Sequence, residues 1–87
     1  MVEQNFIITD DTGIHARPAT QLVNTASQFE SAISLIYKEK LVNLKSIMGV
    51  LSLAVPQNAQ ITIKVEGSDE IAALNKVSDV IKGGLGK

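Results

Sequence analysis

The chain contains no cysteine, which excludes disulfides, thiol catalysis and cysteine metal sites. Aromatic residues make up only 3% of its 87 residues, too few for a base-stacking platform. Eight basic and nine acidic residues leave a formal net charge of −1, without the basic excess typical of nucleic-acid binding. No apolar run approaches a membrane span, and the first residues lack the features of a signal peptide. We therefore expect a soluble cytoplasmic protein that binds neither nucleic acid nor membranes.

Hydrophobic residues amount to 45% of the chain, which predicts one ordered domain over residues 1–87. Segments with strand-like patterns cover residues 2–9, 32–37, 41–43 and 60–66, and the last of these alternates most regularly. Segments with helical patterns cover residues 16–27, 46–53 and about 69–82. The order β-α-β-β-α-β-α predicts an α+β fold, an open-faced two-layer sandwich with a mainly antiparallel sheet.

The predicted helices have apolar stripes that should face the core. In the first helix the stripe consists of Ala16, Ala19, Leu22, Val23 and Ala26, and in the last of Ala73, Leu74, Val77, Val80 and Ile81. We expect Ser68 to cap the last helix, with Asp69 and Glu70 at its positive end. Residues 83–86, three of them glycine, should end that helix and leave a loose tail.

His15 is the only histidine, and it lies in the segment Gly-Ile-His-Ala-Arg-Pro-Ala of residues 13–19. A helix beginning just after it offers unpaired backbone N–H groups and the positive end of a dipole, which together favour a bound anion. Both effects also favour a neutral, nucleophilic imidazole. Arg17 adds a planar set of donors suited to phosphate oxygens. Gly13 permits an unusual backbone angle in the preceding turn.

Other chemistries lack the residues they need. One histidine without nearby cysteines or paired carboxylates cannot supply the three or four ligands of a zinc site. The parts of a hydrolase triad and the glycine-rich ATP loop of a kinase are also missing. The alternative to an anion-carrying role is that His15 only caps the helix or packs against the core. The residues around it leave both interpretations open.

Ser46 precedes a short predicted helix, where a plain N-cap is the commonest role for serine. Phosphorylation at the same place is the functional alternative, because a helix start tolerates a phosphate that adds about −2 charge to a docking face. Ile47, Met48, Val50 and Leu51 crowd fewer than two full turns. We expect Val50 in the core and some of the others in an exposed apolar patch that binds a partner.

Residues 13–19 resemble the active-site signature of HPr, the histidine-containing phosphocarrier of the phosphoenolpyruvate:sugar phosphotransferase system. Residues 43–53 resemble the regulatory serine motif of the same family, at the spacing found there. The resemblance implies a four-stranded antiparallel sheet with three helices on one face. It implies a carrier without metal or cofactor, which is not an enzyme. His15 would accept a phosphoryl group on Nδ1 from phosphorylated enzyme I and pass it to the IIA components of sugar permeases.

The resemblance also assigns residues and partners. Ala16, Arg17 and Pro18 would bind the phosphate, with Arg17 adjusting during transfer. Ser46 would be phosphorylated by HPr kinase/phosphorylase, and that form would be a corepressor with catabolite control protein A in carbon catabolite repression. The chain would be a monomer, and its partner surface would comprise Thr20, Gln21, Asn24, Ile47, Met48 and Leu51.

Two alternatives stay open. The first is a regulatory corepressor paralogue that works through Ser46 only; His15 argues against it, because those paralogues lack the active histidine. The second is a small-ligand or RNA-binding α+β domain with a similar order of elements. The near-neutral charge and the missing row of aromatics count against RNA.

Overall fold

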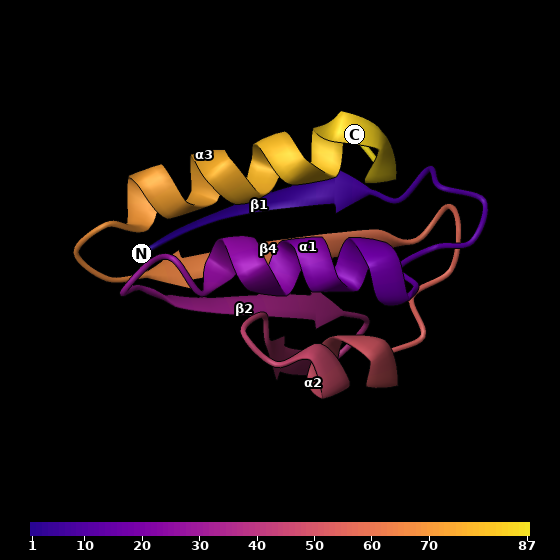
Figure 1. Ribbon diagram of the computed structural model, residues 1–87, viewed down its shortest axis with the longest axis horizontal. Coiled ribbons are helices and arrows are strands. Elements are labelled where there is room, and N and C mark those ends of the chain that lie inside the picture. Colours follow the sequence, from indigo (N-terminus) through magenta and orange to yellow (C-terminus); the bar gives the residue numbers. More distant parts are fainter.

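The computed structural model describes residues 1–87 and contains one four-stranded sheet with helices packed against it (Figure 1). The elements are β1 (Val2–Ile7), α1 (Ala16–Ala26), β2 (Ala32–Tyr37), β3 (Lys40–Asn43), α2 (Ile47–Ser52), β4 (Gln60–Glu66) and α3 (Glu70–Val80), followed by a π-type turn, η1 (Ile81–Leu85). The strand order is β1-β4-β2-β3, and each neighbouring pair is antiparallel. The predicted α+β fold and order of elements are therefore confirmed.

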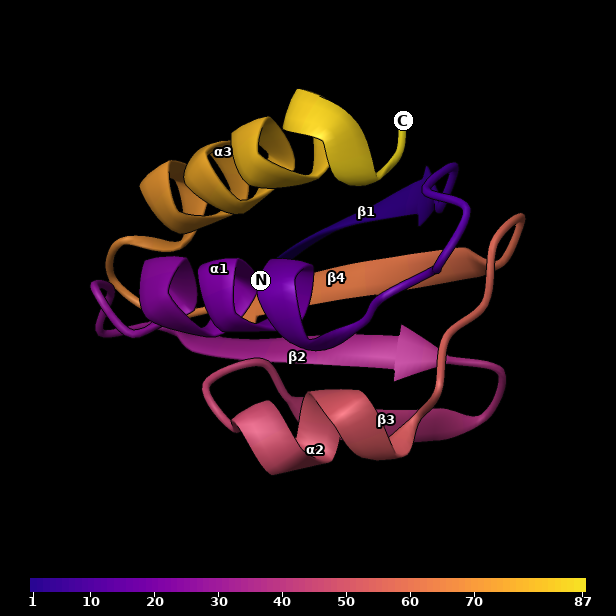
Figure 2. The ribbon, with the colours of Figure 1, turned by 45° about the vertical axis from the view of Figure 1, so that its right-hand side comes forward.

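The core lies between one face of the sheet and the helices. The alternation in β4 places Ile61, Ile63 and Val65 in the core, while their neighbours along the strand are half-buried or exposed. Helix α3 packs on β1 and β4, α2 packs on β3, and α1 contacts both of these helices. Figures 1 and 2 show α1 and α3 side by side on the same face of the sheet. None of the helices is long and apolar enough to cross a membrane.

The apolar stripe of α1 differs from the prediction at its first residue. Leu22 and Ala26 are fully buried as expected, but Ala16 is exposed. Pro18, in the first turn of the helix, is buried instead. A missing N–H does no harm there, since the first N–H groups of a helix have no acceptor within the helix.

The edges of the sheet differ from the predicted bounds by one or two residues. Strand β1 ends at Ile7, because the Ile8 carbonyl accepts the N–H of Asn58 at 2.7 Å, whereas a regular ladder would pair it with the N–H of Ala59. Strand β3 begins at Lys40, one residue early, because the connection from β2 is a tight turn. Lys38 adopts a φ of 56° in this turn, the left-handed conformation that glycine more often supplies.

The C-terminal residues are held in place, so the expectation of a loose tail is wrong. Leu85 is buried, and its carbonyl accepts the N–H groups of Thr9 at 2.9 Å and Asp10 at 3.1 Å. Lys87 exchanges two backbone hydrogen bonds with Ile7, of 2.7 and 2.9 Å. The glycines of this segment form the turn η1 and then let the chain return beside β1. The tail therefore fixes the end of β1 and the loop that leads to His15.

The start of α3 also differs from the prediction, because Asp69 and not Ser68 occupies the N-cap position. The Asp69 carboxylate makes no capping bond; it accepts hydrogen bonds from the Ser31 hydroxyl and from the backbone N–H groups of Glu30 and Ser31, the latter two at 3.0 Å. The hydroxyl first, and the N–H groups after it, lower the pKa of Asp69 below its ordinary value. The side chain thus ties α3 to the loop before β2.

Candidate functional site

His15 occupies the N-cap position of α1, with extended backbone angles of φ −97° and ψ −171°. Its carbonyl accepts the Ala19 N–H at 3.0 Å, as the first bond of the helix. Its imidazole makes no capping hydrogen bond, and 39% of the side chain is exposed. The ring therefore neither caps the helix nor belongs to the core, and it is available to another molecule.

The start of α1 is left without a cap. The backbone N–H groups of Ala16 and Arg17 have no hydrogen-bond acceptor, and Pro18 has no N–H. A serine or aspartate at the N-cap would accept such a hydrogen bond from within the chain, and the imidazole does not. The guanidinium of Arg17 is exposed and forms no ion pair. Two free N–H donors, the helix dipole and a free guanidinium are groups that favour an anion at this helix start.

A hollow of about 280 Å³ connects the start of α1 with the end of α3. Its volume is several times the roughly 30 Å³ that one water molecule occupies, so a phosphoryl-sized anion fits. The lining residues are Asp10, His15, Arg17, Pro18, Gln21, Val80, Gly83, Gly84 and Leu85. The predicted residues His15 and Arg17 are thus brought together, and the C-terminal turn forms the opposite wall.

The turn before His15 depends on Gly13. This residue is buried and has a φ of 70°, and a Cβ atom built on it would lie 2.1 Å from the carbonyl oxygen of Val55. The same oxygen accepts the N–H of Ile14 at 2.9 Å. Only glycine combines this backbone angle with so close an approach. The turn is thereby attached to the loop before β4 and directs residue 15 toward the hollow.

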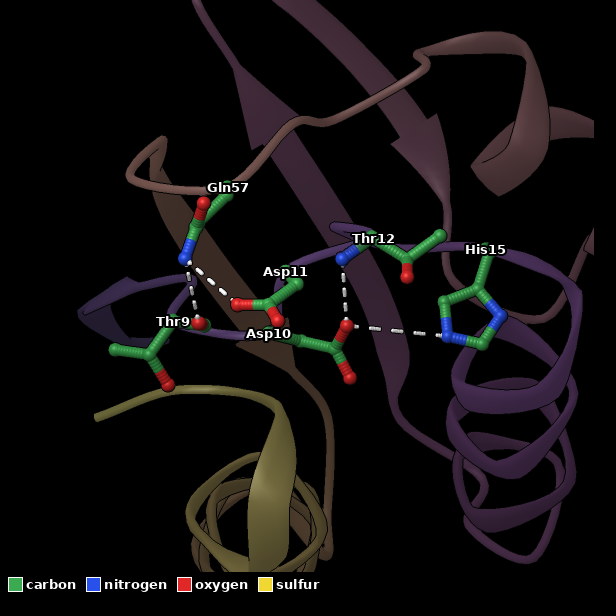
Figure 3. Close-up of polar contacts among 6 residues, drawn as sticks. All are labelled: Thr9, Asp10, Asp11, Thr12, His15 and Gln57. Carbon is green, nitrogen blue, oxygen red and sulfur yellow. Dashed lines mark hydrogen bonds and ion pairs between the residues drawn. The ribbon is translucent and has the colours of Figure 1, made fainter.

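Asp10 also belongs to the site, although the sequence did not predict this. Its pattern indicated only a polar turn. One of its carboxylate oxygens lies 4.0 Å from Nε2 of His15 (Figure 3). The same oxygen accepts the Thr12 N–H at 2.8 Å. The ring therefore lies between a carboxylate and the positive end of α1.

Ser46 is the N-cap of α2, as predicted, and its Oγ accepts the Gly49 N–H at 3.1 Å. The residue is half-buried, so part of it reaches the surface. A Cβ at position 49 would lie 3.2 Å from this Oγ, so the glycine leaves room for the serine side chain. In contrast to α1, this helix supplies its own cap.

The apolar residues of α2 divide as expected between core and surface. Val50 is fully buried, Ile47 and Leu51 are half-buried, and the Met48 side chain is 75% exposed. Figure 2 shows α2 beside α1, on which Thr20, Gln21 and Asn24 are all exposed. Gln21 lines the hollow at His15, whereas no residue of α2 does. The candidate partner surface thus has a polar part beside the hollow and an apolar part next to it.

Known proteins match this chain over almost its whole length. Residues 2–83 match the family described as the PTS HPr component phosphorylation site. The histidine-containing phosphocarrier protein of a mycoplasma is 40% identical, with a TM-score of 0.95 over 99% of both chains. HPr from Thermoanaerobacter tengcongensis is 43% identical, with a TM-score of 0.91 over 95% of this chain and 93% of that one. Crh, the catabolite repression containing protein of Bacillus subtilis, is 39% identical, with a TM-score of 0.76 over 98% of both chains.

The predicted family is therefore confirmed by sequence and by structure. The matches at about 40% identity cover both the segment around His15 and the segment around Ser46. The chain belongs to the HPr family, the histidine-containing phosphocarrier proteins of the phosphotransferase system, and is a phosphocarrier and not an enzyme.

Proposed function

We propose that His15 accepts a phosphoryl group on Nδ1 from phosphorylated enzyme I and passes it to the IIA components of sugar permeases, during phosphoenolpyruvate-dependent sugar uptake. One observation carries the proposal. The exposed imidazole lies at an uncapped helix start, in the same hollow as a free guanidinium. A phosphoryl group that is bound and then released needs hydrogen-bond donors that the unphosphorylated protein does not already use. This site has such donors.

The residues around the ring have separate roles in this proposal. The unpaired N–H groups of Ala16 and Arg17 bind phosphoryl oxygens, and the guanidinium of Arg17 binds them as a planar fork. Pro18 can touch the group only through its ring, because it has no N–H. These donors stabilise the charge on the transferred group in place of water.

The direct test is transfer from phosphoenolpyruvate and enzyme I, followed by intact mass before and after mild acid. We expect one added phosphate that acid removes in the wild type and no addition in His15→Ala. Arg17→Ala should still be phosphorylated, but about 100–1,000-fold more slowly, the size of effect expected from losing positioned donors. A wild-type protein that gains no mass would contradict the proposal.

We also propose that Ser46 is phosphorylated by HPr kinase/phosphorylase, and that this form is a corepressor with catabolite control protein A. The Oγ of Ser46 is half-buried at a helix start, and Met48 projects two residues away on the candidate partner surface. Similarity to Crh, whose description includes catabolite repression, supports a regulatory role. Addition of about −2 charge beside an apolar docking patch opposes binding of an acidic partner.

ATP-dependent labelling tests the serine. We expect an acid-stable phosphate in the wild type and in Ser52→Ala, an exposed serine of the same helix, and none in Ser46→Ala. In Ser46→Asp, phosphorylation of His15 by enzyme I should slow several-fold, because part of the added charge is present. Labelling that persists in Ser46→Ala would show that another residue is phosphorylated. Unchanged transfer to His15 in Ser46→Asp would contradict the electrostatic explanation.

The partner surface in this proposal comprises the exposed Thr20, Gln21 and Asn24 of α1, together with the exposed Met48 and the half-buried Ile47 and Leu51 of α2. Met48 is the most exposed of the apolar group, so Met48→Asp should raise the KM for transfer from enzyme I while the fold stays intact.

We propose that the carrier works as a cytoplasmic monomer. Crh and one HPr of T. tengcongensis are described as dimers, so sedimentation of the wild type at working concentration decides the oligomeric state.

A further inference from the structure

We propose that Asp10 is a positioning residue for phosphoryl transfer: its carboxylate keeps the proton of His15 on Nε2 and so leaves the lone pair on Nδ1. The inference rests on the proposed function, in which Nδ1 is the phosphorylated atom. Asp10 would be a second residue that controls the nucleophile His15. It lies in the preceding turn, outside the active-site signature of residues 13–19.

The geometry places the carboxylate on one side of the ring only. Oδ1 of Asp10 lies 4.0 Å from Nε2, and Figure 3 shows Nδ1 on the other side of the imidazole. The carboxylate is itself fixed, since the same Oδ1 accepts the Thr12 N–H at 2.8 Å and the Asp10 N–H donates to Leu85 O at 3.1 Å. The Asp10 side chain is 31% exposed, so solvent screens it only in part.

The choice of nitrogen follows from the chemistry of a neutral imidazole, which has one N–H donor and one lone-pair acceptor. An ionised carboxylate can only accept, so it stabilises Nε2 with a proton and repels Nε2 with a lone pair. At 4.0 Å this is an electrostatic preference and not a hydrogen bond, and such contacts often tighten when charge develops in the reaction. The preferred tautomer has its lone pair on Nδ1.

The transfer step itself needs no additional proton acceptor. The Nδ1 lone pair forms a bond to phosphorus while the bond from phosphorus to the donor breaks, and its electron pair leaves with the donor. The imidazole keeps its Nε2 proton and becomes positively charged, and the carboxylate of Asp10 faces that charge. When the group moves on, the Nδ1–phosphorus bond breaks, its electrons return to Nδ1, and the ring becomes neutral again.

No other carboxylate competes for this role. Asp10 and Arg17 are the charged side chains in the hollow, and α3 with its C-terminal turn contributes only Val80, two glycines and Leu85. The neighbouring Asp11 points toward Gln57, whose Nε2 lies 3.1 Å from its Oδ1 (Figure 3). Asp11 therefore provides a control of the same charge, one residue away and with a different partner.

Nitrogen-15 NMR of the unphosphorylated protein, at a pH where the ring is neutral, measures the ratio of the two tautomers directly. The variant Asp10→Asn keeps a side-chain oxygen to accept the Thr12 N–H but removes the negative charge. We expect the ratio of Nε2–H to Nδ1–H to fall by up to about fivefold, the factor that two unit charges at this distance give in bulk water and an upper bound for the partial charges of a neutral ring. Asp11→Asn should leave the ratio unchanged, and Asp10→Glu should restore part of it.

Transfer from phosphorylated enzyme I provides the second measurement. In Asp10→Asn, kcat should fall about fivefold with little change in KM, because the docking surface is intact. An unchanged tautomer ratio together with unchanged kcat would overturn the role of Asp10, and so would equal losses in Asp10→Asn and Asp11→Asn. If the wild type accepts no phosphoryl group, the proposed function fails, while the NMR ratio still decides whether Asp10 sets the tautomer.

Discussion

At the scale of single residues, the site depends on groups that are left without partners. The imidazole of His15, the guanidinium of Arg17 and the N–H groups of Ala16 and Arg17 make no internal hydrogen bonds or short ion pairs, apart from the 4.0 Å approach of Asp10. Every buried side-chain nitrogen and oxygen of the chain has a hydrogen-bond partner. The unused donors at the start of α1 are distinguished by their place, because they lie in one hollow with the imidazole and the guanidinium.

Gly13 determines the backbone conformation of the loop that positions His15. Its replacement should therefore lower the stability of the fold. In Gly13→Ala the new Cβ would collide with the Val55 carbonyl, and a φ of 70° is itself unfavourable for alanine. We expect the free energy of unfolding to fall by roughly 2–4 kcal/mol, as for other substitutions that combine backbone strain with overpacking. Denaturant titration measures this loss. Gly83→Ala is the control, because nothing lies within 4 Å of a Cβ there, and an equal loss in both variants would contradict the explanation.

At the scale of elements, α1 and α2 have opposite arrangements at their first turns. Ser46 caps α2 from within the chain, whereas His15 leaves the start of α1 open. The sequence predicted both helix starts, because serine before an apolar run and proline in a first turn are local signals. An anion supplied from outside can therefore be held at α1 without breaking a cap.

The end of α2 offers a test of helix termination. Ala54 follows the C-cap Leu53 with a φ of 49°, a position where glycine is usual. Ala54→Gly removes a left-handed strain of about 1–2 kcal/mol and loses about 0.5–1 kcal/mol of chain entropy. We expect a net stabilisation of about 0.5 kcal/mol in denaturant titration. Ala72→Gly, at an exposed position inside α3, should instead destabilise by about 1 kcal/mol; stabilisation by both would refute the role of φ.

At the scale of the whole molecule, contacts between distant segments decide what the sequence could not show. Patterns within one segment correctly predicted β2, β4, the cap Ser46 and the burial of Val50, because each depends on near neighbours. The ordered tail, the role of Asp69 and the approach of Asp10 to His15 were missed. The first two depend on partners far away in the chain, and Asp10 depends on how the 9–15 loop closes. Patterns within one segment cannot predict these contacts between segments, because the contacts depend on the topology of the whole chain.

The contact of Asp69 with the loop at residues 30–31 predicts a pH dependence of stability. Because its pKa is lower in the folded chain than in the unfolded one, the stabilisation is complete above the unfolded value and is lost as pH falls through the folded value. Acidification below about pH 4 should therefore lower the free energy of unfolding. The dependence should be weaker in Asp69→Asn and unchanged in Asp79→Asn, which alters an exposed carboxylate of the same helix. Identical pH curves for wild type and Asp69→Asn would contradict it.

The uncapped start of α1 couples the free energy of unfolding to the group-transfer potential of a phosphoryl group bound there. In a thermodynamic cycle, the free energy by which a phosphoryl group stabilises the folded chain equals the free energy by which folding strengthens the hold on that group. In the proposed function, each donor at the helix start that binds the phosphoryl group therefore lowers the group-transfer potential of phosphorylated His15. A few exposed donors, instead of a closed cage, keep that potential high enough for the group to be released to the next acceptor.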